Sequence, residues 1–224
     1  MSSWSHSKSP QGSAEQKGPV VYVVDDDASI RMALDGLLRS VGLHVETFET
    51  SEAFLAYAKN NVPSCLVLDV RLRGESGLTF QEQIEKNGVQ MPIVFMTGHG
   101  DIAMTVKAMK AGAVDFLAKP FRDQDMLDAV SAALAKDGER LVAEQSTASL
   151  QAAYASLTSR EREVMSYVVA GLMNKQIAYE LNLSEVTVKV HRGQVMRKLE
   201  ARSVADLVRK AESLGIKPQS KASP

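Results

Sequence analysis

Five polar side chains, each at or just after the end of a short apolar run, are of types that suit phosphoryl chemistry. They are Asp25, Asp26, Asp69, Thr97 and Lys119. Three carboxylates held close together repel one another unless a cation neutralises them, and hard oxygen ligands suit Mg²⁺. A hydroxyl and an ammonium opposite a metal-bound carboxylate can hold the three oxygens of a phosphoryl group during an in-line transfer. Asp69 stands alone after its run and is the predicted acceptor, because a carboxylate attacks phosphorus once charge repulsion is screened.

The apolar runs beside these side chains have the length and composition of buried β-strands. They are Val20–Val24, Leu43–Phe48, Cys65–Val70, Ile93–Thr97 and Val114–Ala118, and segments of helical period separate them. Five strands alternating with five helices predict an α/β domain with a doubly wound parallel sheet that is covered on both faces. In the strand order 2-1-3-4-5, the carboxyl ends converge near the switch point between the first and third strands. The five polar side chains would then share one edge of the sheet.

The alternative is that these residues have only structural roles, as helix caps and turn residues. A single aspartate at a strand end is more often a helix cap than a ligand, and a Lys-Pro pair after a strand is usually a turn. The metal site is favoured because the acid pair, the lone acid, the hydroxyl and the lysine follow successive strands of one repeating unit. Asp27 is the exception: it precedes an amphipathic segment and is expected to place negative charge at a helix N-terminus.

The composition of the chain excludes several classes of protein. The chain has 224 residues, of which 45% are hydrophobic and 24% are charged, so it is neither wholly disordered nor collagen-like. No apolar run approaches the roughly 18 to 20 residues of a membrane helix, and the first residues have no apolar core of a signal peptide. We therefore expect a cytoplasmic protein with no membrane partner. A single cysteine, Cys65, excludes a disulfide within the chain and disfavours a thiolate metal cluster.

Residues 18 to about 136 resemble a response-regulator receiver domain. The resemblance is carried by VVDDDASIR from Val23, LVLDVR from Leu66, TGHG from Thr97 and DFLAKPF from Asp115. It implies that a sensor histidine kinase phosphorylates Asp69 and that Thr97 and Lys119 hold the phosphoryl group. The implied ligands of Mg²⁺ are Asp26, Asp69 and the backbone carbonyl of Arg71, and Asp25 is implied to assist through water. It further implies that Phe116 reorients as Thr97 moves, and that the bond between Lys119 and Pro120 is cis.

Three features near the predicted site need their own interpretation. His99 follows Thr97 by two residues and is interpreted as an exposed loop residue rather than a proton carrier. Arg73 stands where the family often has a proline, so the geometry of that loop is less certain. The helix expected after Thr97, which carries Met104 and Met109, borders the fifth strand. We hypothesise that this surface pairs two phosphorylated receivers into a homodimer.

From Leu157 to about Leu214 the strand signal disappears and only helical signals remain. Thr158 and Glu161 form the T-x-x-E capping box of a helix start, and Gly171 ends that helix. Asn174 is the expected cap of a short second helix, and Ser184 that of the next. Two helices joined by a tight turn indicate a helix-turn-helix, whose second helix enters the major groove of DNA.

The second of these helices has a face that fits a groove. Val188, Val195 and Leu199 fall on one side, which must be the core side. The opposite side carries Val186, Lys189, Val190, Gly193 and Arg197. We expect Lys189 and Val190 to read base edges, including a thymine methyl group. We expect phosphate contacts from Thr187, His191, Arg192 and Arg197. For an isolated helix a solvated basic face would be the better interpretation, and the helix and turn that precede it reverse that preference.

This second region resembles the LuxR-type four-helix DNA-binding domain. The resemblance covers residues 157 to 214 and is carried by LTSREREV, GLMNKQIA and LSEVTVKVHR. It implies that Lys175 also contacts DNA and that a fourth helix, Val204–Leu214, serves dimerisation. The whole chain then resembles a FixJ-type response regulator: a transcription factor that is phosphorylated on Asp69, forms a homodimer, binds promoter DNA and acts on RNA polymerase. We do not expect an independent enzyme, although a receiver assists its own phosphoryl transfer and dephosphorylation.

The predicted organisation is a disordered tail over 1–17, a receiver over 18–136, a linker over 137–156, a DNA-binding domain over 157–217 and a tail over 218–224. The linker sequence fits either a helix or a flexible connection. The net charge of −1 divides accordingly: residues 18–136 hold 11 basic against 16 acidic residues, and residues 157–217 hold 11 against 7. The acidic part is where a divalent cation is expected, and the basic part is where DNA is expected. The alternative function is a transcription factor whose receiver is an interaction domain and is never phosphorylated. A free-standing kinase or phosphatase is disfavoured because no nucleotide-binding loop is present.

Overall fold

The protein is represented by a computed structural model, which describes residues 18–72, 75–98 and 112–216. The chain divides into two compact units, Met1–Leu141 and Val142–Pro224. Within the described residues, no helix is both long enough and apolar enough to cross a membrane. The predicted tails, Arg73, His99 and the helix that carries Met104 and Met109 lie outside the described residues.

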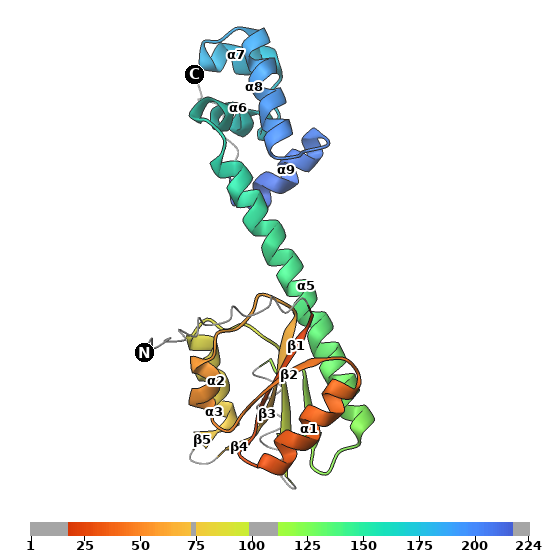
Figure 1. The fold of residues 1–224 in the computed structure, drawn as a ribbon. Helices are drawn as coiled ribbons and strands as arrows, with labels where there is room; N and C mark the ends of the chain where they lie inside the picture. Colours follow the sequence, from red (N-terminus) through yellow and green to blue (C-terminus); the bar gives the residue numbers. More distant parts are fainter. Residues whose placement is uncertain (1–17, 73–74, 99–111, 217–224) are drawn as a thin grey trace, which may run out of the picture. The chain divides into compact units, whose positions relative to one another are not determined.

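The first unit is built on a parallel sheet of five strands (Figure 1). These are β1 (Val20–Val24), β2 (His44–Phe48), β3 (Ser64–Asp69), β6 (Ile93–Thr97) and β7 (Asp115–Ala118). Their order is β2-β1-β3-β6-β7, which confirms the predicted 2-1-3-4-5 arrangement. Because β1, β3 and β6 are buried along their whole lengths, their continuous apolar runs have the character of strands covered on both faces.

Helices cover both faces of this sheet, as the sequence predicts. On one side lie α1 (Ala28–Ser40) and the first part of α5 (Asp123–Ala155), and on the other lie α2 (Ser51–Ala56) and α3 (Gly77–Lys86) (Figure 1). Leu34, Leu38 and Met126 belong to the core under α1 and α5. Phe54 and Phe80 belong to the core under α2 and α3, where their rings meet edge to face at 5.9 Å.

The sequence does not predict the short hairpin that follows β3. Strands β4 (Arg71–Leu72) and β5 (Glu75–Ser76) pair antiparallel there, and only Val70 separates β4 from the end of β3. Two residues per strand are too few to produce a readable alternation of apolar and polar side chains. The hairpin returns the chain to Gly77, whose N–H donates to the carbonyl of Val70 at 2.8 Å.

Helix α5 is continuous through the predicted linker. Its N-terminal part is held in the first unit by Asp137, a fully buried carboxylate that accepts from the backbone N–H of Ser64 and from Arg140 Nε, both at 2.8 Å. Its last turns pack into the core of the second unit through Leu150 and Tyr154. The linker is therefore helical, which is one of the two states that the sequence left open.

Up to residue 216, where the description of the second unit ends, its secondary structure is all helical, as predicted. After α5 it contains α6 (Ser159–Val169), α7 (Asn174–Leu181), α8 (Glu185–Lys198) and α9 (Val204–Ser213). The capping box of Thr158 and Glu161 is confirmed, and Ser184 caps α8 by accepting from the N–H of Thr187 at 3.1 Å.

One cap in the second unit was predicted wrongly. The N-cap of α7 is Met173, whose backbone N–H donates to the side chain of Gln176 at 2.9 Å. Asn174 is the first residue of the helix, and its side chain accepts instead from Arg192. A glutamine at N3 therefore satisfies the helix terminus without a capping side chain at the N-cap.

Candidate functional site

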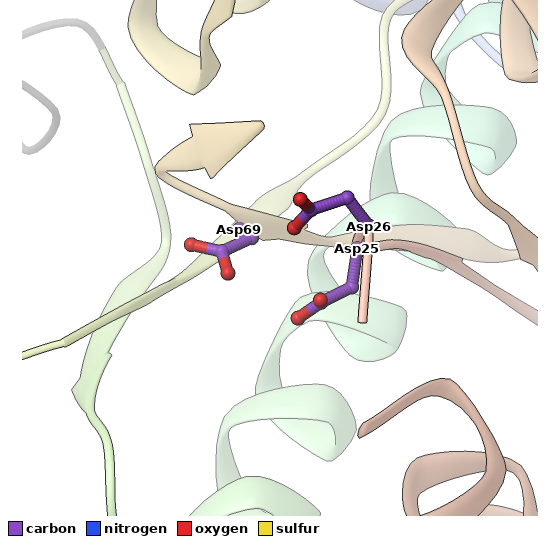
Figure 2. A group of neighbouring side chains, drawn as sticks. All are labelled: Asp25, Asp26 and Asp69. Atoms are coloured by element: carbon purple, nitrogen blue, oxygen red, sulfur yellow. The ribbon is translucent and has the colours of Figure 1, made fainter. Parts of the chain in front are cut away.

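Three aspartates from two neighbouring strands meet at one edge of the sheet. Asp25 and Asp26 follow β1, and Asp69 ends β3 (Figure 2). One carboxylate oxygen of each lies within 4.8 Å of the others. Asp25 is fully buried, Asp69 is 8% exposed, and Asp26 is half-buried. The structure therefore brings the three acids together at the edge of the sheet where the sequence predicts them.

Lys119 joins this cluster directly. Its Nζ donates to Asp25 Oδ2 at 2.8 Å and to Asp69 Oδ2 at 2.6 Å. Burial raises the pKa of Asp25 above its usual value, against the hydrogen bond from Lys119, which lowers it. Burial acts to lower the pKa of Lys119, but the hydrogen bonds to the two carboxylates raise it overall. The ammonium is therefore held firmly in its charged state between the two acids.

The charges and donor atoms of the cluster fit a divalent cation. Three carboxylates and one ammonium carry a formal charge of −2, and the carboxylate oxygens are hard ligands that suit Mg²⁺. Backbone contacts orient two of the acids: Asp25 Oδ1 accepts from the N–H of Asp27, and Asp69 Oδ1 accepts from that of Arg71, at 2.8 and 2.9 Å. Each of these carboxylates thus has a fixed direction at the site. The role of the Arg71 carbonyl as a ligand stays a prediction.

Gly77 lies against the predicted acceptor and has no room for a side chain. A Cβ atom built on Gly77 would stand 2.6 Å from the carbonyl oxygen of Asp69 and 3.0 Å from the Cα of Val70. Both neighbours are backbone atoms, which cannot move aside as a flexible side chain would. A glycine at this position therefore lets α3 begin directly behind Asp69.

Thr97 and Phe116 lie on the two strands at the other side of β3. Thr97 is 2% exposed at the end of β6, and its carbonyl accepts from the N–H of Lys119 at 2.6 Å. Its hydroxyl donates to the carbonyl of Gly98 at 3.1 Å. Phe116, on β7, is half-buried against the aromatic core. The peptide bond between Lys119 and Pro120 is cis, as the resemblance implied.

The sequence predicts that Asp27 caps α1, and Asp27 does accept from the N–H of Ser29 at 2.8 Å. It does not predict two other contacts at this site. One is the bond from Arg31 Nη1 to the carbonyl of Asp25 at 2.6 Å, and the other is the close approach of Gly77 to Asp69. The signal for Arg31 was its place in the first turn of the helix after the acid pair. The signal for Gly77 was only that a glycine occurs shortly after the lone acid, and glycines are common in loops.

The second unit presents the predicted face on α8. Val188 and Val195 are buried, whereas Val186 and Val190 are 72% and 56% exposed. The predicted contact residues Lys175, Lys189 and Arg197 are exposed, and Thr187, His191 and Arg192 are half-buried. The helical phase read from the sequence is therefore the one observed.

Three of the predicted phosphate contacts have partners within the second unit. The hydroxyl of Thr187 is hydrogen-bonded to that of Ser184 at 2.8 Å. Arg192 Nη1 donates to Asn174 Oδ1 at 2.9 Å, which joins α8 to the first residue of α7. Arg197 is hydrogen-bonded to Gln194 on its own helix. The sequence did not predict Asn174 as the partner of Arg192, because the two residues are 18 positions apart.

Each of the two units matches a known protein family. Residues 21–131 match the family model of the response regulator receiver domain, and residues 155–211 match that of bacterial regulatory proteins of the luxR family. Nodulation protein W of Bradyrhizobium diazoefficiens is 54% identical over 197 residues, which cover 88% of this chain and 87% of that protein. Transcriptional regulatory protein FixJ of Azorhizobium caulinodans is 42% identical over 204 residues, covering 91% and 97%.

Solved structures give the same result. The response regulator StyR is 50% identical, with a TM-score of 0.80 over 87% of this chain and 98% of that one. Full-length FixJ from B. japonicum is 40% identical, with a TM-score of 0.52 over 89% and 98%.

Proposed function

Because this chain belongs to the response regulators that join a receiver domain to a luxR-family DNA-binding domain, we propose that phosphorylation of Asp69 controls its binding to promoter DNA. The observation that carries the proposal is the cluster of Asp25, Asp26 and Asp69 with Lys119 bonded to two of its members. We take residues 18–136 as the receiver, 137–156 as the linker and 157–217 as the DNA-binding domain.

The proposed transfer uses Asp69 as the nucleophile. A carboxylate oxygen of Asp69 forms a bond to the phosphorus of a phosphohistidine on a sensor kinase, and the P–N bond breaks with its electron pair going to the imidazole nitrogen. Lys119 exchanges its bond to Asp69 for one to a phosphoryl oxygen, and the Thr97 hydroxyl turns from Gly98 toward another. The product is an acyl phosphate whose charge these two side chains share.

The residues that would hold Mg²⁺ are Asp25, Asp26, Asp69 and the backbone carbonyl of Arg71. When bound, the cation supplies charge neutralisation between the acids and the incoming phosphoryl group. Asp25 is fully buried, and its bond to Lys119 leaves it facing the interior of the site, which fits the implied contact through water. Phe116 is the proposed switch residue that follows the movement of Thr97.

The proposed output is DNA binding by a phosphorylated homodimer in the cytoplasm, with RNA polymerase as a further partner. Exposed Lys189 and Val190 on α8 would read base edges. The proposed phosphate contacts are Lys175, Thr187, His191, Arg192 and Arg197. The hydrogen bond from Arg192 to Asn174 supports this role, because it fixes the guanidinium while leaving other N–H groups to donate.

Phosphorylation is tested by labelling the full chain with ³²P from a small phosphodonor. We expect an alkali-labile label that requires Mg²⁺, does not form in the presence of a chelator and is absent in Asp69→Asn. Asp35→Asn, at a partly exposed position of α1 where Asp35 pairs with Arg39, is the matched control and should label as the wild type does. Equal labelling of the wild type and Asp69→Asn would overturn the assignment and favour a receiver that is only an interaction domain.

DNA binding is tested by measuring affinity against salt concentration. Affinity should fall steeply as salt rises, because phosphate contacts release counterions. Lys189→Ala on α8 should weaken binding, whereas Arg160→Ala, which removes the same charge from an ion pair on α6, should not. Binding that does not depend on salt would contradict the phosphate contacts.

A further inference from the structure

Two valines on α8 are exposed although large apolar side chains usually find a partner. Val186 is 72% exposed and Val190 is 56% exposed. They are four residues apart, so they are neighbours on one face of the helix. Buried Val188 and Val195 lie on the other face and supply its contact with the core. Val186 and Val190 are therefore not part of the core packing of α8.

The middle of this exposed face is an apolar stripe that ends at a glycine. At 100° per residue, Val186, Val190 and Gly193 fall within about 60° of one another on α8. A Cβ atom added at Gly193 would meet nothing within 4 Å. Lys189 borders the stripe on one side and is exposed. The face thus offers two isopropyl groups along its centre, followed by bare backbone, with a cation beside them.

We propose that Val186 and Val190 each contact the 5-methyl group of a thymine, so that two thymines per half-site determine which DNA this protein selects. The inference rests on the proposed DNA-binding function and adds Val186 as a second specificity residue. An isopropyl group makes no hydrogen bond, so a base edge that presents only donors or acceptors would lose its water without compensation. Thymine is the base whose major-groove edge presents a methyl group.

The spacing of the two valines limits the spacing of the two thymines. Four residues of α-helix rise about 6 Å, and successive base pairs of B-DNA are about 3.4 Å apart. The two methyl groups should therefore lie one or two base steps apart. Gly193 adds no side chain to this readout, so base selection should weaken beyond the position that Val190 contacts.

The experiment replaces thymine by uracil, which removes only the methyl group. The phosphorylated full chain first selects duplexes from a random pool, and each thymine of the selected site is then changed in turn to deoxyuridine. We expect two positions per half-site at which the change weakens binding about fourfold, which corresponds to about 0.8 kcal/mol for one buried methyl group.

Protein variants assign each methyl group to its valine. Val186→Ala should abolish the effect of deoxyuridine at one of the two positions, and Val190→Ala at the other. Because both side chains are exposed, these changes should alter the free energy of unfolding by no more than about 0.5 kcal/mol, so a folding failure is not expected. Val142→Ala is the matched control on α5, where a valine is 72% exposed. It should leave the dependence on both methyl groups intact.

The possible failures are distinguishable. If the protein retains no duplex, the proposed DNA-binding function fails and the inference fails with it. If it binds DNA with steep salt dependence but deoxyuridine has no effect at any position, the function stands and the two-thymine readout is wrong. Methyl dependence that persists in both Val186→Ala and Val190→Ala would equally overturn it, because another residue would then read the methyl groups.

Discussion

Replacing Gly77 by alanine should damage the phosphorylation site from behind. The added Cβ atom would stand 2.6 Å from the carbonyl oxygen of Asp69, whereas ordinary contacts begin near 3.4 Å. Relief of the clash requires a shift of about 0.8 Å, which must fall on the backbone of Asp69, of Val70 or of the first turn of α3. The hydrogen bond from the Gly77 N–H to the carbonyl of Val70 resists that movement.

Two magnitudes follow from this shift. Forcing one extra carbon atom into a packed site costs about 1–3 kcal/mol of stability. A misplacement of about 1 Å at a reacting group can cost about a hundredfold in rate, so a shift of about 0.8 Å at Asp69 should slow phosphorylation by roughly tenfold to a hundredfold. The rate loss should exceed what the loss of folded protein explains, because most of the variant remains folded.

The assay combines urea denaturation with the rate of labelling by a small phosphodonor, which needs no docked kinase. Gly36→Ala is the matched control: the same methyl group on α1 meets nothing within 4 Å. It should stabilise the protein by about 0.4–1 kcal/mol and leave the labelling rate unchanged. If Gly77→Ala labels at the wild-type rate, the close approach does not position Asp69 and the reasoning is refuted.

Three further predictions concern buried charge. Asp137→Ala should lower the free energy of unfolding by about 2–4 kcal/mol, because the buried N–H of Ser64 loses its acceptor; a loss below about 1 kcal/mol in urea denaturation would contradict this. Burial raises the pKa of Asp25, so its contribution to stability is present at acidic pH and is lost as pH rises through that raised pKa. Asp25→Asn should therefore stabilise the protein without Mg²⁺ at pH 7 and have little effect at pH 3, and calorimetry that finds the reverse order would contradict the sign. The bond from Lys198 lowers the pKa of Glu161, so the stability from this pair is present above the ordinary carboxyl range and is lost as pH falls through the lowered pKa. Lys198→Met should destabilise the second unit at pH 7 and much less at pH 3, as thermal unfolding at the two pH values would show.

The sequence predicts the acid cluster because the order of the strands largely determines where the three acids lie. Asp25, Asp69 and Lys119 each follow a strand of one parallel sheet, and such strands bring their carboxyl ends to a common edge. Residue type then indicates the chemistry. What the pattern does not contain is the direct bonding of Lys119 to two carboxylates, because the alternation of strands and helices carries no information on side-chain direction beyond the strand end.

Contacts between distant residues were the main omissions. Asp137 and Ser64 are 73 residues apart, and Asp137 lies in a segment whose composition fits a helix or a linker equally well. The bond between Arg192 and Asn174 was hidden by the expectation that Asn174 caps α7. Periodicity identifies which face of a helix is buried, but it does not identify the partner of a polar side chain on that face.

Helix α5 also determines where recombination can join the receiver of one regulator to the DNA-binding domain of another. Buried Asp137 bonds to Arg140 in one unit and Tyr154 packs against the core of the other, whereas every residue from 142 to 149 is exposed. A crossover between two related genes within this stretch would leave both sets of buried contacts with their own partners, whereas one before Asp137 would separate that residue from Ser64. Recombination that attaches a new output domain to an existing receiver should therefore succeed most often when the junction falls in these eight codons.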